Sequence, residues 1–593
     1  MTNQELADTF ERIANLLDIK GEIVYKTLAY RRVAENLRVF PEDINTVFKE
    51  NRLAEVPGVG KAISEKITEL LETGQLGFLE RLKEEVPLSL IDLLQVPDVG
   101  PRKAALFWKQ AGVTNLAELD TAARAGKLRA LPGMGEKSEA RILSGLEALG
   151  RRSKRMLLGT AWPIARRWLD WLRQQPGVQR AEAAGSLRRW RSTIGDLDLV
   201  AASDHPAEVM DAFIHHPEVM RVLGQGENKS SIELSSGLKL QLWVQPPQRF
   251  GTLWVYATGS KDHNVRIREL AQKKGLSLSE QALVDGQGEE TLYDSEEKVY
   301  AALGFPWIPP ELREDRGEVQ AAKAGQLPEL LELSDIRAEL HAHSTWSDGV
   351  ETIEGMAQAA RGRGYKVLAI TDHSGGLGIA NGLSVERLCQ QKDAIQLAQE
   401  KMGDSIRLLN GTEVDIMADG SIYYPDEVLA ELDIVIASLH ASLRQPRQVI
   451  TARLLKAIHN PHVDIIGHPS GRLLPDREGA DLDWEAVLAG AKESGVALEI
   501  NADPVRLDLD EVYARRAAEM GIVMSIATDA HSIESLEHME YGVAVARRAW
   551  CGPGSVLNAW PAEKLVGWLK KRGYSGEDIR NLTTKDTKNT KIS

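Results

Sequence analysis

The sequence predicts a multidomain chain: an all-α N-terminal region, an α/β middle region and a C-terminal TIM-like β/α barrel. Three observations predict this. Amphipathic helical patterns interrupted by glycine fill roughly the first 180 residues, and strand patterns carrying an Asp-x-Asp pair follow. Beyond residue 335, strand, histidine or carboxylate, and helix alternate about seven times. With 593 residues, and roughly 150 residues per domain, the chain has room for about four units.

Composition narrows the class of protein. Hydrophobic residues make up 43% and charged residues 27%, as in soluble globular proteins. The two cysteines, Cys389 and Cys551, cannot build a disulfide framework, and the polar start lacks the pattern of a signal peptide. The apolar runs are far shorter than the roughly 18 residues of a membrane span. We expect a cytoplasmic protein with no membrane partner. The net charge of −14 restricts any nucleic-acid binding to local basic patches.

One turn pattern occurs three times in the helical region. The copies are Val56-Pro57-Gly58-Val59-Gly60-Lys61, Val96-Pro97-Asp98-Val99-Gly100-Pro101 and Leu131-Pro132-Gly133-Met134-Gly135-Glu136. Each precedes a helical stretch with a basic residue near its start. Such a turn presents backbone N–H groups and a helix N-terminus to a phosphate. The alternative is that the glycines only make tight turns between helices.

Three copies resemble helix-hairpin-helix motifs, which bind DNA without reading its sequence. The resemblance implies that the turn glycines contact the DNA backbone: Gly58, Gly60, Gly100, Gly133 and Gly135.

The middle region carries a candidate metal and nucleotide site. Gly185-Ser186-Leu187-Arg188-Arg189 precedes Asp196 and Asp198 by a short loop. Residues two apart in a strand share a face, so both carboxylates can bind Mg²⁺ ions that bridge a triphosphate and an attacking hydroxyl. An Asp-x-Asp pair alone is usually a solvated strand edge. The neighbouring Gly-Ser turn and Arg189 supply donors for phosphate oxygens.

Together with the segment 256–264, Tyr-Ala-Thr-Gly-Ser-Lys-Asp-His-Asn, this region resembles the nucleotidyltransferases of the family X DNA polymerases. The resemblance covers residues 1–315 and implies gapped or primer-template DNA and deoxynucleoside triphosphates as partners. It implies catalytic roles for Asp196, Asp198 and Lys66, the last as a Schiff-base lysine. It implies nucleotide binding by Gly185, Ser186, Arg189, Tyr256, Gly259, Asn264 and Arg268.

One position weakens the polymerase prediction, and the lyase role of Lys66 has an alternative. Family X enzymes carry a third catalytic Asp on the next strand, where this chain has Gln241. A neutral amide removes charge from the metal site and cannot accept a proton, so we expect phosphoryl transfer to be slower by orders of magnitude. Glu233 on the preceding strand is a possible substitute that nothing in the sequence positions. An exposed helical lysine is an equally good reading of Lys66, because a lyase lysine needs a depressed pKa.

The region beyond residue 335 carries the clearest candidate catalytic site. Its histidines and carboxylates follow predicted strands at 336–340, 367–371, 406–409, 434–439, 465–467, 496–500 and 522–527. A single histidine is more often a loop or cap residue, but such repetition places ligands at the C-terminal ends of barrel strands. His and carboxylate ligands there can bind two or three Mn²⁺, Zn²⁺ or Fe²⁺ ions and support phosphodiester hydrolysis.

Residues 335–575 resemble the PHP (polymerase and histidinol phosphatase) domain through His-Ala-His-Ser, Thr-Asp-His-Ser, Gly-Thr-Glu-Val-Asp, Ser-Leu-His, Gly-His-Pro-Ser-Gly-Arg and Thr-Asp-Ala-His-Ser. The resemblance implies Mn²⁺- or Zn²⁺-dependent 3′→5′ exonuclease or phosphoesterase activity. The ligands it implies are His341, His343, Asp348, His373, Glu413, His440, His468, Asp529 and His531.

The predicted domains are helix-hairpin-helix regions at 1–85 and 86–150, a nucleotidyltransferase palm and thumb at 151–315, a linker at 316–334, the PHP domain at 335–575 and a polar tail at 576–593. A base-excision-repair enzyme that binds gapped DNA and hydrolyses 3′ ends fits this order. Two alternatives stay open: a DNA-binding phosphoesterase with a non-catalytic nucleotidyltransferase fold, and a small-molecule phosphatase similar to histidinol phosphatase.

Overall fold

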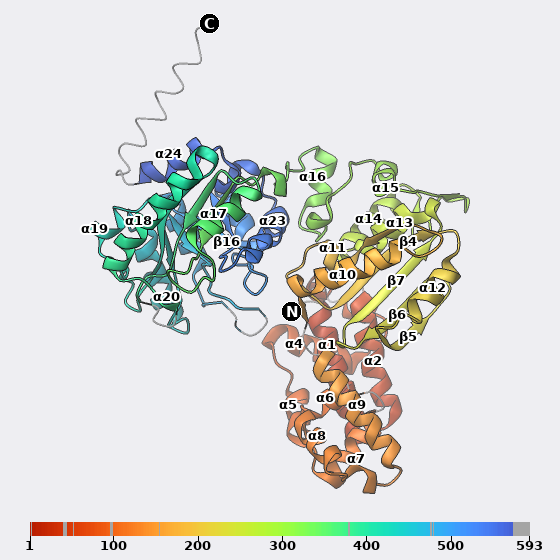
Figure 1. Cartoon of the computed structure of the whole chain (residues 1–593). Helices are drawn as coiled ribbons and strands as arrows, with labels where there is room; N and C mark the ends of the chain where they lie inside the picture. Colours follow the sequence, from red (N-terminus) through yellow and green to blue (C-terminus); the bar gives the residue numbers. More distant parts are fainter. Residues whose placement is uncertain are drawn as a thin grey trace. The chain divides into compact units, whose positions relative to one another are not determined.

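The computed structural model describes residues 1, 3–39, 44–50, 52–94, 96, 99–152, 155–376, 380–474, 477 and 479–572. The predicted polar tail lies outside these residues. The chain divides into two compact units, residues 1–154 and 155–593, each of which is described by itself (Figure 1).

The first unit is all-α, as the sequence predicts. Its helices are α1 (Asn3–Lys20), α2 (Val24–Val39), α3 (Ile44–Lys49), α4 (Lys61–Thr73), α5 (Gly77–Glu85), α6 (Leu90–Leu93), α7 (Pro101–Ala111), α8 (Leu116–Arg124) and α9 (Glu136–Arg152), with 3₁₀ turns η1 (Leu53–Glu55) and η2 (Leu128–Ala130). Side chains from Leu6 to Ile142 form one hydrophobic core. The helix-hairpin-helix regions predicted at 1–85 and 86–150 therefore pack as a single body.

The three repeated turns adopt one geometry. The N–H of Val59, Val99 and Met134 donates to the carbonyl three residues earlier, at 3.0 Å in each copy. Gly60 and Gly100 are the residues before α4 and α7, and all five predicted contact glycines are exposed. Gly58 and Gly133 have φ of 84° and 74°, a conformation that favours glycine. Residues 97 and 98 of the second copy lie outside the described residues.

The second unit begins with the predicted α/β region. A five-stranded sheet has the order β2-β4-β7-β6-β5. Its strands are β2 (Val178–Ala183), β4 (Asp196–Ser203), β5 (Val219–Gln225), β6 (Lys229–Leu234) and β7 (Lys239–Gln245). A two-stranded ribbon, β1 (Met156–Leu157) and β3 (Thr193–Ile194), lies beside α10 (Leu158–Arg173), and α11 (Gly185–Arg188) and α12 (Pro206–Ile214) follow β2 and β4. The strand predicted at 194–202 is thus divided between β3 and β4.

A helical subdomain follows the sheet. Its elements are η3 (Pro247–Arg249), α13 (Phe250–Thr258), α14 (Lys261–Lys273), β8 (Ser277–Leu278), β9 (Leu283–Val284), β10 (Glu290–Thr291), α15 (Glu296–Leu303) and η4 (Pro310–Leu312). The short strands pair antiparallel as β10-β9-β8. The fully buried Tyr300 and Ile308 belong to the separate core of this subdomain.

The segment predicted as a linker is more ordered than expected. Residues 316–334 contain α16 (Glu318–Ala324) and the first two residues of η5 (Leu333–Asp335). Glu318 is fully buried and its carboxylate accepts a hydrogen bond from Nδ1 of His263 at 2.6 Å. Weak periodicity concealed this helix because only Val319 and Ala322 join the apolar core, and the third buried residue, Glu318, is polar.

The C-terminal region is a parallel barrel whose strands follow one another in the order β11-β12-β13-β14-β15-β16-β17. The strands are β11 (Ala338–Ala342), β12 (Val367–Ile370), β13 (Arg407–Asp415), β14 (Ile434–Ser438), β15 (Ile465–Gly467), β16 (Ala497–Asn501) and β17 (Met524–Ala527). A parallel bridge between Ala342 and Ala530 joins the first strand to the last. All seven predicted strands are present, and β13 extends past the predicted end at 409, so that Glu413 lies within the strand.

Helices surround the barrel and cover the end that lies opposite the C-terminal ends of its strands. They are α17 (Ile353–Gly362), α18 (Val385–Met402), α19 (Asp426–Leu429), α20 (Arg447–Ile458), α21 (Trp484–Ser494), α22 (Glu511–Glu519), α23 (Met539–Arg548) and α24 (Ala562–Arg572), with 3₁₀ turns η7 (Gly403–Ser405), η8 (Glu534–His538), η9 (Pro553–Ser555) and η10 (Leu557–Ala559). Leu565 and Leu569 of α24 pack against Leu340 and Ile436 of the strands. This packing leaves the opposite, C-terminal ends of the strands for the polar residues.

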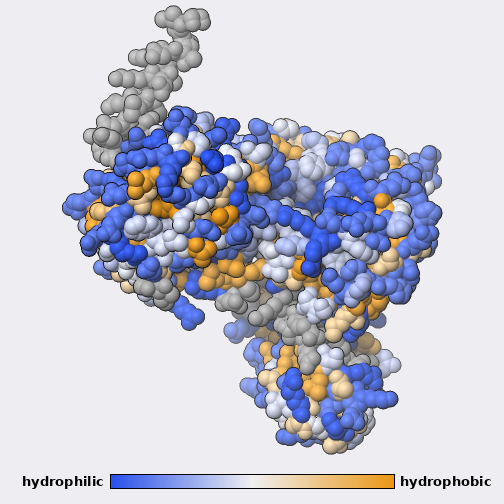
Figure 2. Space-filling model, in the orientation of Figure 1, coloured by the Kyte–Doolittle hydropathy of each residue, from blue (hydrophilic) through white to orange (hydrophobic). Residues whose placement is uncertain are grey.

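The surface in Figure 2 is mostly hydrophilic, with small scattered hydrophobic patches. In the described part of the chain, none of the helices combines the length and apolarity needed to cross a bilayer. Cys389 and Cys551 are both free thiols, the first exposed and the second buried.

Candidate active sites

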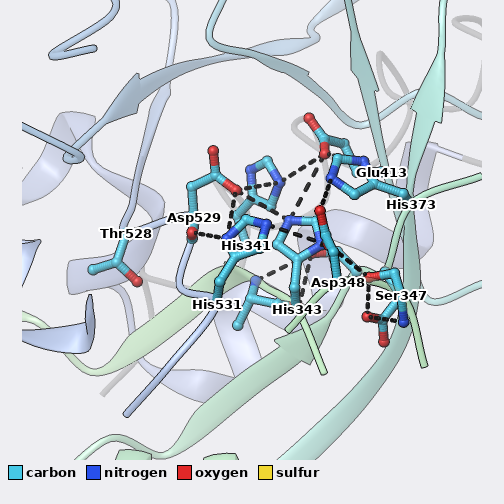
Figure 3. Close-up of polar contacts among 12 residues, drawn as sticks. His341, His343, Ser347, Asp348, His373, Glu413, Thr528, Asp529 and His531 are labelled. Carbon is cyan, nitrogen blue, oxygen red and sulfur yellow. Dashed lines mark hydrogen bonds and ion pairs between the residues drawn. The ribbon is translucent and has the colours of Figure 1, made fainter. Parts of the chain in front are cut away.

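The C-terminal ends of the barrel strands bring the predicted ligands together (Figure 3). His341 lies in β11 and His343 directly follows that strand. Glu413 lies in β13, and Asp529 and His531 lie in the loop after β17. Eight of the nine predicted ligands form three groups whose ligand atoms lie within 4.8 Å of one another. The groups are His341, His343, Glu413 and Asp529; His343, Asp348, His373 and His531; and His373, Glu413 and His440.

Glu413 lies at the centre of this cluster. Its Oε1 lies 3.1 Å from Nε2 of His440 and 2.9 Å from Nε2 of His468, and its Oε2 lies 2.8 Å from Nδ1 of His373. The ninth predicted ligand, His468, thus joins the cluster through this carboxylate. Glu413 is 1% exposed, so its charge is shielded from water and depends on these neighbours.

Several buried nitrogens of the cluster have no hydrogen-bond partner. They include Nε2 of His341 and Nδ1 of His343, both on fully buried side chains. A buried polar atom without a partner is costly, and an imidazole lone pair that faces two carboxylates suits a metal cation. The donor set of imidazoles and carboxylates therefore fits divalent transition metals.

A second layer of carboxylates orients the imidazoles. Glu499 Oε2 accepts a hydrogen bond from Nδ1 of His341 at 2.7 Å, and Asp415 Oδ1 accepts one from Nδ1 of His440 at 2.9 Å. These bonds place the protons on Nδ1, so that Nε2 carries the lone pair directed into the cluster. Sequence reasoning missed both residues, although a glutamate inside the buried strand Ala497–Asn501 was a signal that could have been read.

The electrostatics of the cluster follow from burial and proximity. Burial, together with the neighbouring His373, lowers the pKa of His343 to about 4, which keeps this imidazole neutral at pH 7. Burial opposes charge on His440, but Glu413 and Asp415 raise its pKa to about 10. Without a cation, the two carboxylates thus hold an additional proton on His440, and a metal would displace it.

The backbone also departs from ordinary geometry at two of the predicted ligands. His468 and Asp529 have φ of 25° and 53°, in a region that non-glycine residues seldom adopt. Such conformations persist where the surrounding structure determines them, and they are frequent at functional sites.

The candidate nucleotidyltransferase site lies on neighbouring strands of the five-stranded sheet. Asp196 and Asp198 are on β4, and Asp198 pairs with Gln241 of the parallel strand β7. Nε2 of Gln241 donates a hydrogen bond to Oδ2 of Asp196 at 3.0 Å. Gln241 therefore lies beside both carboxylates, as expected for the position of the third catalytic Asp. Glu233 instead pairs with Arg221 at 3.3 Å.

The two carboxylates are crowded enough to favour a cation. Burial and the nearby charge of Asp196 raise the pKa of Asp198 to about 7. Gly185 makes this approach possible, because a Cβ there would lie 2.0 Å from Oδ2 of Asp198. Its φ of 58° also favours glycine.

The other predicted nucleotide-binding residues lie around the same turn. Arg189 donates from Nη1 to the carbonyl of Thr258, directly before Gly259, and α11 begins with Gly185 and Ser186. Nδ2 of Asn264 donates to the carbonyl of Tyr256 at 2.7 Å, and the guanidinium of Arg268 lies 5.9 Å from the Tyr256 ring centre. The structure brings the two sequence motifs together, but it engages Nε of Arg189 with Glu314 at 3.1 Å. Their nucleotide-binding roles stay predictions.

Lys66 lies on α4 in the first unit. Its Nζ donates to the carbonyl of Ala62 at 3.2 Å and lies 5.2 Å from the centre of the Phe78 ring. The side chain is half-buried rather than fully exposed. These contacts orient the amine, and the lyase role of Lys66 stays a prediction.

Sequence models of known families match four parts of the chain. They describe a helix-hairpin-helix domain (residues 1–76), a SAM-like helix-hairpin-helix tandem (90–148), a DNA polymerase beta thumb (253–314) and a PHP domain (339–503). The DNA polymerase/3′-5′ exonuclease PolX of Bacillus subtilis is 39% identical over 574 residues, which cover 96% of this chain and all of that protein. The chain belongs to the PolX family.

Two further relatives match a shorter part of this chain and nearly all of their own length. A probable phosphatase of Thermoanaerobacter sp. is 32% identical over 253 residues, 40% of this chain and 98% of that protein. A probable phosphatase of Shewanella sediminis is 30% identical over 250 residues, again 40% of this chain and 96% of its own length. The PolX chain thus joins a barrel with free-standing relatives to a family X polymerase region, and its helix-hairpin-helix, thumb and PHP assignments from sequence are confirmed.

Proposed function

We propose that this PolX chain repairs DNA by processing 3′ ends at gaps. The barrel is a metal-dependent 3′→5′ exonuclease and phosphoesterase. The helix-hairpin-helix unit holds gapped or primer-template DNA, and the nucleotidyltransferase region binds deoxynucleoside triphosphates. The observation that carries this proposal is the convergence of nine imidazoles and carboxylates, with unpartnered buried nitrogens, at one end of the barrel.

In the barrel, the three ligand groups would hold two or three divalent ions, with Mn²⁺ or Zn²⁺ matching the imidazole-rich donor set. Bound ions would supply Lewis acidity at a phosphoryl group and activate water. Glu499 and Asp415 fix the imidazole tautomers. The buried floor of the site excludes bulk water, which strengthens every electrostatic contact made by a phosphate there.

In the nucleotidyltransferase region, Asp196 and Asp198 would hold Mg²⁺ and the Gly185-Ser186 turn would face the triphosphate. Gln241 supplies an amide hydrogen bond to Asp196 where a third carboxylate would add charge. We therefore expect nucleotide addition to be slow in the natural sequence and to increase in the Gln241→Asp variant.

The same hydrogen bond supports a second candidate function. A nucleotidyltransferase fold that binds DNA ends without extending them would tolerate a neutral residue at position 241. A third candidate, hydrolysis of a small phosphomonoester, is favoured by the probable phosphatases that match the barrel. It leaves the three exposed turns of the first unit without a role.

The test uses a 5′-labelled primer on a one-nucleotide gap, with Mn²⁺ or Mg²⁺ and all four deoxynucleotides, resolved on a denaturing gel. Wild type is compared with His341→Ala, with Gln241→Asp and with His459→Ala. His459 is an exposed histidine whose Nδ1 lies 2.7 Å from the carbonyl oxygen of Leu455, so it controls for loss of an imidazole outside the site.

We expect wild type and His459→Ala to shorten the primer, His341→Ala to leave it intact, and Gln241→Asp to extend it. Shortening that survives in His341→Ala would place the nuclease elsewhere. Extension by His341→Ala with Gln241 in place would show that the third carboxylate is dispensable. Faster hydrolysis of a free phosphomonoester than of a recessed 3′ end would favour the small-molecule phosphatase.

A further inference from the structure

The turn that carries Arg189 is held by residues of the barrel. Nη1 of Arg548, at the end of α23, donates to the backbone carbonyl of Arg189 and to Oε1 of Glu314 at 3.1 Å. The same oxygen of Glu314 accepts from Nε of Arg189. Glu314 thus lies between two guanidinium groups, one from the nucleotidyltransferase region and one from the barrel.

The other terminal nitrogen of the Arg548 guanidinium, Nη2, forms a hydrogen bond within the barrel domain. It donates to Oε1 of Glu511, the first residue of α22, at 2.8 Å. Burial opposes the charge on Glu511, but Arg548 and Arg191 lower its pKa to about 2. The side chain of Arg548 is only 2% exposed. A guanidinium buried to this extent is stable only while its acceptors stay in place.

Packing reinforces the polar contacts. Trp190 has a φ of 55°, which is uncommon for a bulky residue. Its ring packs edge-on against Trp162 at 4.9 Å and against Tyr541 of α23 at 6.2 Å between centres. The backbone from 189 to 191 therefore adopts its conformation in contact with the barrel domain.

Arg189 retains capacity for a ligand in this arrangement. Its Nε and Nη1 are engaged by Glu314 and by the carbonyl of Thr258, and within the described residues its Nη2 has no hydrogen-bond partner. Arg548 also shares the charge of Glu314, so the carboxylate does not neutralise Arg189 alone. A triphosphate at the Gly185-Ser186 turn would therefore meet a guanidinium that is both fixed in place and incompletely neutralised.

We propose that Arg548 is a positioning residue for the nucleotide site: the barrel domain fixes Arg189 and thereby sets the affinity of the nucleotidyltransferase region for a deoxynucleoside 5′-triphosphate. This inference rests on the proposed binding of triphosphates by that region. Loss of Arg548 would release the Arg189 turn and leave Glu314 to pair with Arg189 and, at 3.8 Å, with Arg191. Both changes reduce the attraction for the triphosphate.

The experiment compares neighbouring arginines in the full chain. Arg548→Met is matched with Arg547→Met, because Arg547 also bridges the two regions, through Glu311 at 2.8 Å and Glu332, but contacts neither Arg189 nor Glu314. Titration calorimetry measures Kd for a non-hydrolysable deoxynucleoside triphosphate and for the corresponding monophosphate, with Mg²⁺ and gapped DNA. Primer shortening by the barrel is measured in parallel as a test of folding.

We expect Arg548→Met to weaken triphosphate binding at least fivefold, to change monophosphate binding less than twofold, and to retain primer shortening. Arg547→Met should leave both affinities within twofold of wild type. Equal triphosphate affinity in the two methionine variants, or equal losses for triphosphate and monophosphate, would overturn the inference. Wild type that binds no triphosphate would instead refute the proposed function.

If Arg548→Met loses primer shortening, the milder variants Arg548→Lys and Arg547→Lys test the same positioning role. A lysine keeps the charge beside Glu314 but cannot reach the Arg189 carbonyl and Glu511 together. We expect Arg548→Lys to weaken triphosphate binding at least threefold and Arg547→Lys to leave it unchanged. Wild-type affinity in Arg548→Lys would show that its contact with the turn does not position Arg189.

Discussion

Replacing Glu499 with glutamine changes one atom of a fully buried side chain and should greatly weaken metal binding by the barrel. Each carboxylate oxygen of Glu499 now accepts. Oε2 accepts from Nδ1 of His341 at 2.7 Å, and Oε1 accepts from the backbone N–H of His468 at 3.0 Å and from Nδ2 of Asn501 at 2.9 Å. An amide has one acceptor oxygen, so it cannot serve both sides.

Either orientation of the amide has a cost. With its oxygen toward His468 and Asn501, the NH₂ group faces Nδ1 of His341 and drives the imidazole proton to Nε2, which then cannot bind a metal. With its oxygen toward His341, two buried donors lose their acceptor, at about 1–3 kcal/mol each. Loss of such outer carboxylates typically costs about 10–100-fold in metal affinity, or about 1.4–2.8 kcal/mol.

The assay is a Mn²⁺ titration of primer shortening on a recessed 3′ end. We expect the half-saturating Mn²⁺ concentration of Glu499→Gln to rise about 10–100-fold. Glu431→Gln is the matched control, since Glu431 is 76% exposed and contacts only Lys392, at 3.3 Å. A half-saturating concentration for Glu499→Gln within twofold of both wild type and Glu431→Gln would refute the argument about tautomers.

Three further predictions concern other parts of the chain. Glu296→Gln leaves two buried arginines with one carboxylate fewer and should destabilise the second unit by about 3–5 kcal/mol in urea unfolding, whereas the neighbouring exposed Glu297→Gln should unfold like wild type. Gly133→Ala places a side chain at a φ of 74°, so it should lower the free energy of unfolding by about 1–2 kcal/mol and weaken DNA binding. Gly135→Ala is the control: a Cβ there has nothing within 4 Å, and the free energy of unfolding should change by less than half as much. Equal effects of the two variants would contradict this prediction. Mg²⁺ affinity at the nucleotidyltransferase site should rise with pH through about 7, because burial and Asp196 raise the pKa of Asp198 to about 7 and the cation binds the ionised carboxylate. Because the folded state holds this proton more tightly than the unfolded state, Asp198 makes the ion-free fold more stable below that pH than above it. A Mg²⁺ affinity that does not change with pH would disprove the shift.

The convergence of the histidines and carboxylates could be predicted from sequence, because strand ends in a parallel barrel converge on one rim. His341, Glu413 and Asp529 are far apart along the chain, but each follows or ends a run of buried apolar residues. The order of the predicted strands therefore predicted that the ligands lie together, without any knowledge of distances. Glu499 escaped notice because it lies inside a strand, where its role depends on which imidazole lies opposite.

The buried network around Arg548 could not be predicted for a related reason. Arginine and glutamate at helix ends, such as Arg548 and Glu511, usually remain in water, and their exposed pairs contribute little. What changes their role here is the contact of α22 and α23 with the turn that carries Arg189, a contact between regions more than 300 residues apart in the chain. Sequence patterns encode which face of one element is apolar, but they do not encode which polar groups two domains bury against each other. Because the burial of Arg548 requires Glu314 and Glu511 together, the network can form only when both regions are folded and in contact. The nucleotidyltransferase turn and the barrel are therefore coupled through a structure that neither region contains alone.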